Sequence, residues 1–100
     1  MTPKTEALAD LRARIDELDD EILELLQKRA AVALEIGRVK KRHALAVIDR
    51  PREKAVLDRL MIKSRGRPLE GQVIADIYSA IVRACLAAQE PAGNDGEVRT

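Results

Sequence analysis

The feature that most constrains the fold is a stripe of apolar residues between positions 8 and 39, spaced alternately by three and four. This heptad spacing is typical of a helix that buries one continuous face against partner helices. The pattern predicts one helix from about residue 6 to about residue 42, roughly 54 Å long at 1.5 Å per residue. The stripe consists of Leu8, Leu11, Ile15, Leu18, Ile22, Leu25, Arg29, Val32, Ile36 and Val39.

Two shorter helices are expected in the second half of the chain. Asp49 and Pro51 form a helix-start signal, because Asp caps free N–H groups and proline loses no hydrogen bond in a first turn. This helix should end near the segment SRGRP at 64–68. A further apolar pattern predicts a third helix, starting at about 69–72 and ending near Gln89. The expected fold class is therefore all-α, with one very long and two shorter helices per chain.

The chain of 100 residues has the size of one domain, which we place at residues 1–90. Residues 91–100 are polar and contain Gly and Pro, and we expect them to form a disordered tail. The long apolar stripe is more than two short helices can cover, so an exposed face of this size indicates a partner. We expect an intertwined homodimer in which the long helices pair and the short ones pack around them.

Charge and composition exclude several classes of protein. Eighteen Lys and Arg against seventeen Asp and Glu give a net charge of +1, and Tyr78 is the single aromatic residue. This argues against nucleic-acid or membrane binding, which needs excess positive charge and, for single strands, stacking aromatics. One cysteine, Cys85, and no signal-peptide or spanning pattern favour the cytoplasm. With a single histidine, the sequence predicts no metal site, and we expect no cofactor.

The stripe is broken by an arginine. Arg29 occupies a seam position, and Lys40, eleven residues later, returns to nearly the same face of the helix. Ala33 and Gly37 lie between them, so the face would be a shallow trough with a cation at each end, suited to a small polyanion. Alternatively, Arg29 could set the helix register, and Gly37 could serve close helix packing.

Three motifs give this pattern a family likeness. They are L-R-x-x-I-D-x-L-D from residue 11, R-x-x-x-A-x-x-x-G-x-x-K from residue 29, and D-x-x-R-E from residue 49. Together with a third helix ending in glutamine, over about residues 8 to 90, the chain resembles the all-helical chorismate mutase family. That resemblance implies an intertwined homodimer and the Claisen rearrangement of chorismate to prephenate, in aromatic amino acid biosynthesis.

The resemblance also implies roles for the residues that match its motifs. Arg12 would reach from the partner chain to one substrate carboxylate, and Arg29 would hold the other. Lys40 and Gln89 would both donate to the ether oxygen of the breaking C–O bond. No nucleophile, acid or base is needed for a pericyclic reaction, which is accelerated by conformer selection and charge stabilisation.

The remaining implied contacts lie on the second and third helices. Asp49 and Glu53 would meet the ring hydroxyl, and Arg52 would lie near the carboxylates. Cys85 stands where relatives often carry serine, and because a thiol is a weak donor we expect it only to line the pocket.

Other functions fit parts of the same pattern. An isochorismate-pyruvate lyase would share the fold and the arginine–lysine set, although the acids Asp49 and Glu53 favour the mutase. A non-catalytic helical dimerisation module would use Arg29 only to set register, and Arg29→Leu should then stabilise the dimer. A further alternative is a mutase that docks onto another shikimate-pathway enzyme.

Overall fold

The computed structural model describes residues 2–89 and shows an all-α chain. Its three helices are α1 (Pro3–Arg42), α2 (Arg50–Lys63) and α3 (Gln72–Gln89), and residues 2–89 contain no strand. The prediction of one very long and two shorter helices is confirmed. Residues 91–100, for which we expect a tail, lie outside the described residues.

The helix α1 begins three residues earlier than the apolar pattern predicts. Thr2 is its N-cap: the Thr2 side chain accepts a hydrogen bond from the backbone N–H of Thr5, and the Thr5 side chain bonds back to Thr2. Pro3 follows in the first turn, where its missing N–H costs nothing. This capping box gives the helix a defined start ahead of its apolar stripe.

At its other end, α1 stops in a left-handed turn without a glycine. Ala44 has φ 54, and Leu45 donates its backbone N–H to the carbonyl of Lys40 at 2.8 Å. Ala44 donates to the carbonyl of Lys41 at 3.3 Å, which completes the Schellman pattern of a helix C-terminus. A left-handed alanine is strained, since its Cβ crowds the backbone.

The predicted cap of α2 is confirmed. The carboxylate of Asp49 accepts the backbone N–H of Arg52 at 3.0 Å. At the C-terminal end of α2, Ser64 is buried, and its hydroxyl donates to the carbonyl of Met61 at 2.8 Å. A side chain therefore caps each end of α2, that of Asp49 at the start and that of Ser64 at the end.

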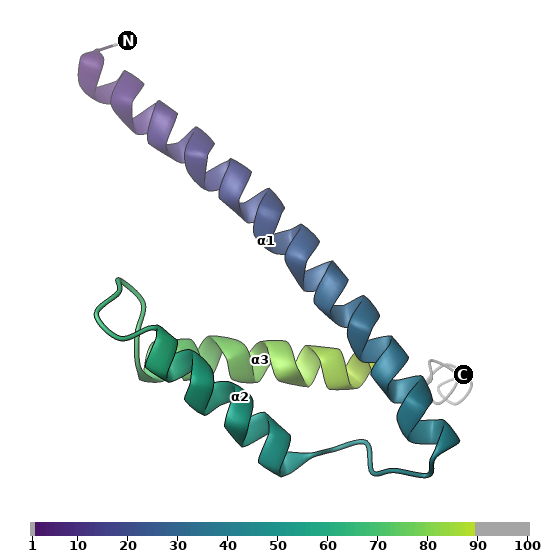
Figure 1. The fold of residues 1–100 in the computed structure, drawn as a ribbon. Helices are drawn as coiled ribbons and strands as arrows, with labels where there is room; N and C mark the ends of the chain where they lie inside the picture. Colours follow the sequence, from purple (N-terminus) through teal and green to yellow (C-terminus); the bar gives the residue numbers. More distant parts are fainter. Residues whose placement is uncertain (1, 90–100) are drawn as a thin grey trace, which may run out of the picture.

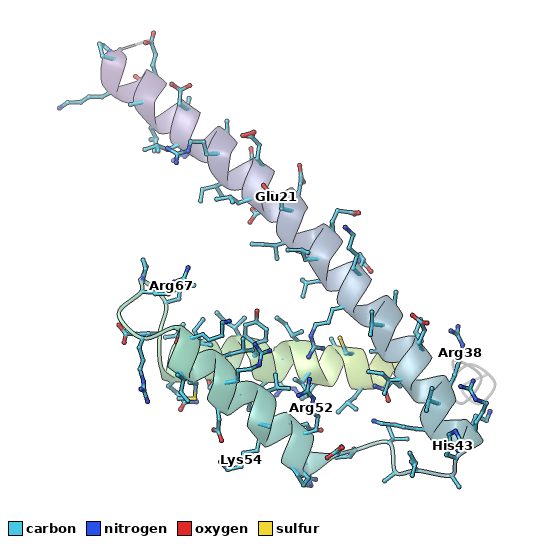
Figure 2. All side chains as sticks on the ribbon, in the orientation of Figure 1. Glu21, Arg38, His43, Arg52, Lys54 and Arg67 are labelled. Atoms are coloured by element: carbon cyan, nitrogen blue, oxygen red, sulfur yellow. The ribbon has the colours of Figure 1, made fainter. Side chains whose placement is uncertain are left out.

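The helices pack in an open arrangement that leaves half of α1 uncovered. α3 contacts both α1 and α2, whereas the N-terminal half of α1, on which Glu21 lies, runs clear of the other two helices (Figures 1 and 2). The radius of gyration is 18.4 Å, compared with about 13 Å for a compact domain of this length. The long dimension of the chain is therefore set by α1 alone.

The core that this arrangement forms is small. Buried apolar residues within 2–89 are Ala33, Val56, Ala75 and Cys85. The stripe on α1 stays exposed, with Leu25 at 62% and Ile15 at 56% of full exposure. No helix in the described part of the chain combines the length and apolarity needed to cross a membrane.

Candidate active site

A cavity of about 420 Å³ opens where the C-terminal half of α1 meets α2 and α3. Its size lies within the range of roughly 300–1,000 Å³ that is typical of small-molecule sites. All three helices and the residue before α2 contribute side chains. The lining consists of Arg29, Val32, Ala33, Ile36, Lys40, Asp49, Arg52, Glu53, Val56, Val82, Cys85, Leu86 and Gln89.

The two cations of α1 line the same cavity, as the helical spacing predicts. Arg29 and Lys40 are both half-buried, and the buried Ala33 lies between them on the helix. The Lys40 ammonium donates to the backbone carbonyl of Val47 and to the side-chain oxygen of Gln89 at 3.4 Å. An ammonium has three N–H groups, so the two bonds within residues 2–89 leave one N–H of Lys40 that can donate to a ligand.

The start of α2 supplies two acids and a third cation. Asp49, Arg52 and Glu53 line the cavity within a single turn, and Arg52 extends from the side of α2 that faces α3 (Figure 2). The Oε2 atom of Glu53 is buried and has no hydrogen-bond partner among residues 2–89. A buried carboxylate oxygen without a donor is costly, and a ligand hydroxyl would satisfy it.

The last two turns of α3 form the remaining wall. Cys85 is only 6% exposed, and Gln89 is half-buried, four residues further along the same face. Val82 and Leu86 add apolar surface. This wall combines one amide with apolar groups, which suits a ligand that has a hydrocarbon ring and few polar atoms.

Gly37 does not line the cavity, so the expectation that it leaves room for a ligand is wrong. A Cβ atom at this position would lie 3.1 Å from the Cβ of Gln89 and 3.2 Å from its Cγ. The structure supports the alternative explanation, close packing between α1 and α3. Ala33, by contrast, is part of the cavity wall.

Arg12 lies far from the cavity of its own chain. It is exposed and seventeen residues before Arg29 on one continuous helix, which is about 25 Å along the axis. The sequence-predicted residues Arg29, Lys40, Asp49, Arg52, Glu53, Cys85 and Gln89 all come together at the cavity, and only Arg12 is separate.

The charges of the lining favour an anion that also carries a hydroxyl group. Three cations, Arg29, Lys40 and Arg52, face two carboxylates, Asp49 and Glu53. Arginine binds carboxylates through two parallel hydrogen bonds, and carboxylates accept from hydroxyls. Within residues 2–89, no three His, Cys, Asp or Glu side chains are grouped as metal ligands would be.

The sequence gives no signal for one functional contact, that between Lys40 and the carbonyl of Val47. This carbonyl belongs to the linker between α1 and α2, and every residue carries the same backbone group. Helical spacing alone assigns the apolar wall residues Val56 and Val82 to a core and does not identify them as cavity residues.

Comparison with known proteins points to one family. The sequence model of chorismate mutase type II matches residues 11–90. A protein named chorismate mutase from Methanocaldococcus jannaschii is 27% identical over 85 residues, which cover 85% of this chain and 86% of that protein.

Longer relatives combine two activities in their names. Bifunctional chorismate mutase/prephenate dehydratase of Stutzerimonas stutzeri is 39% identical over 88% of this chain and 25% of its own length. The protein of the same name from Escherichia coli strain K12 is 31% identical over 90% of this chain and 23% of its own length. The chain thus spans about a quarter of these two relatives.

Proposed function

The chain belongs to the chorismate mutase type II family, and we propose that it converts chorismate to prephenate. The observation that carries this proposal is the set of side chains in one cavity of about 420 Å³. Cations for carboxylates, donors for an ether oxygen and acids for a hydroxyl match the polar groups of chorismate in kind. The relative of similar length that is named chorismate mutase supports the same assignment.

The proposed reaction is an isomerisation, in which one C–O bond breaks while one C–C bond forms within the same molecule. No proton is transferred and no co-reactant is consumed. The protein can therefore accelerate it only by holding the compact chair-like conformer and by stabilising charge that develops in the transition state. Arg29 would bind one carboxylate, Arg52 would lie near the carboxylates, and the apolar wall would enclose the ring.

Negative charge grows on the ether oxygen as the C–O bond breaks, and Lys40 and Gln89 are the donors that we assign to it. The Lys40 ammonium already donates to Val47 and Gln89, which fixes its position before a ligand binds. Preorganised donors of this kind need no reorganisation during the reaction and are worth more than donors in water.

We assign the ring hydroxyl to Asp49 and Glu53. The unpartnered Oε2 of Glu53 supports this role, because a hydroxyl can donate to it. Cys85 would contribute shape and little hydrogen bonding, since a thiol is a weak donor.

A homodimer would complete the site. Arg12 cannot reach the cavity of its own chain, and the exposed stripe of α1 (Leu8, Leu11, Ile15, Leu18, Ile22 and Leu25) offers a long apolar face to a second α1. In an antiparallel pair, the start of one α1 passes the middle of the other and would bring Arg12 to the partner's cavity. The single cysteine favours a reducing, cytoplasmic location.

The test is to supply chorismate and isochorismate separately to the purified protein. The proposal predicts loss of the ultraviolet absorbance of chorismate with formation of prephenate. Release of salicylate and pyruvate from isochorismate at a higher kcat/KM would instead assign the chain as a lyase.

A further inference from the structure

The helix α1 itself does not explain why a glycine stands at position 37. Gly37 lies inside the helix, five residues before the last helical residue, Arg42, and glycine is the poorest helix former after proline. Its backbone is helical and does not have the positive φ values found at Gly66 and Gly71. A conformation that only glycine can adopt is therefore not the reason for its presence.

The structure explains the glycine by its close contact with Gln89 of α3. A Cβ at position 37 would lie 3.1 Å from the Cβ of Gln89, 3.2 Å from its Cγ and 3.5 Å from its Cα. These atoms are the backbone and stem of Gln89, and not the mobile end of a side chain. An added methyl group at position 37 would therefore require the stem of Gln89 to shift by a few tenths of an ångström.

The same approach places the amide of Gln89 beside Lys40. The Gln89 Oε1 atom accepts from the Lys40 ammonium at 3.4 Å. Because the amide oxygen is occupied by this cation, the amide NH2 group is left as the donor that can reach a ligand. The ammonium in turn is held by the carbonyl of Val47.

We propose that Gly37 is a positioning residue, which lets the last turn of α3 approach α1 so that Lys40 orients the Gln89 amide with its NH2 group toward the substrate. This rests on the proposed mutase function. Gly37 itself touches no substrate, and it acts on the rate only through Gln89.

The test is a double-mutant cycle with Gly37→Ala, Gln89→Ala and the double variant, measuring kcat and KM. Gly37→Ala should lower kcat about tenfold and change KM less than about threefold, because a small misplacement of a donor weakens transition-state stabilisation. In the Gln89→Ala background, the Cβ contact persists but no amide remains, so adding Gly37→Ala should change kcat less than about twofold. Ala31→Ser adds one heavy atom at an exposed position outside the cavity, and it should leave kcat unchanged.

If Gly37→Ala lowers kcat equally in the wild type and in Gln89→Ala, the proposal is overturned, since equal losses would indicate general distortion of the helices. An unchanged kcat in Gly37→Ala would overturn it as well. Circular dichroism checks that every variant keeps its helices.

A second measurement tests the contact between Lys40 and Gln89 if Gly37→Ala does not fold or if the wild type lacks mutase activity. The side-chain amide NMR signals of Gln89, assigned by their loss in Gln89→Ala, should shift in Lys40→Met and stay in place in Arg38→Ala. Unmoved signals in Lys40→Met would refute the orienting contact. A wild type without turnover, but with this shift, would reject the proposed function alone.

Discussion

Two inactive variants should restore one another when their chains are mixed. Arg12 and Arg29 lie about 25 Å apart on the single rigid helix α1, and only Arg29 lines the cavity. If Arg12 acts in the partner's cavity, each site takes its two arginines from different chains. Arg12→Ala and Arg29→Ala homodimers then have two defective sites each, whereas a mixed dimer has one intact site and one that lacks both arginines.

The expected activities of the variants and of their mixture follow from the number of intact sites. Loss of one partner from a buried, hydrogen-bonded charge pair costs about 3 kcal/mol, or roughly a hundredfold in kcat/KM. Random exchange of an equal mixture gives about half mixed dimers. Since each has one intact site of two, the mixture should recover about a quarter of wild-type activity.

The assay unfolds the two variants together in denaturant, refolds them and follows the loss of chorismate. Each variant refolded alone is the control and should stay roughly a hundredfold below the wild type. Activity of the mixture equal to the mean of the two variants would refute the shared site. Full activity of Arg12→Ala would remove Arg12 from the mechanism.

Three further predictions concern the site, a helix end and the interface. Lys40→Met should lower kcat by about 10²–10³-fold with little change in the melting temperature, because water can replace the lost donor at the exposed Val47; a loss under fivefold would contradict its assigned role. Ala44→Gly should raise the free energy of unfolding by about 0.5–1 kcal/mol, measured by denaturant titration, since φ is 54 there; an unchanged or lower stability would contradict the strain. Ile15→Glu with Ile22→Glu, both on the exposed stripe, should shift the sedimentation coefficient from dimer toward monomer, and an unaltered dimer would place the interface elsewhere.

Helix α1 shows how far apolar spacing determines a fold. The alternation of threes and fours between Leu8 and Val39 predicts its length within a turn, because burial of one face dictates both the spacing and the helix. The helix starts three residues before the predicted position, since the capping by Thr2 depends on a hydrogen bond to Thr5 that apolar spacing does not report. The end of α2 at Lys63, by contrast, lies next to the predicted segment 64–68, and the Ser64 hydroxyl donates there to the carbonyl of Met61.

The site was predictable in its charged residues and less so in its packing. Arg29 and Lys40 share a face by helical periodicity alone, but the same periodicity left a register role for Arg29 open. For Gly37, room for a ligand and close helix packing require the same residue, so the sequence could not decide between them. The placement of Gln89 against Gly37 depends on how α3 crosses α1, which is a property of the tertiary structure.

The most direct test of the proposed function is a product balance followed by proton NMR on the purified chain with chorismate. We predict that each molecule of chorismate lost appears as one molecule of prephenate, with no pyruvate released, at a rate far above that of the uncatalysed reaction. Chorismate that disappears at the uncatalysed rate, or whose loss is matched by pyruvate, would contradict the assignment.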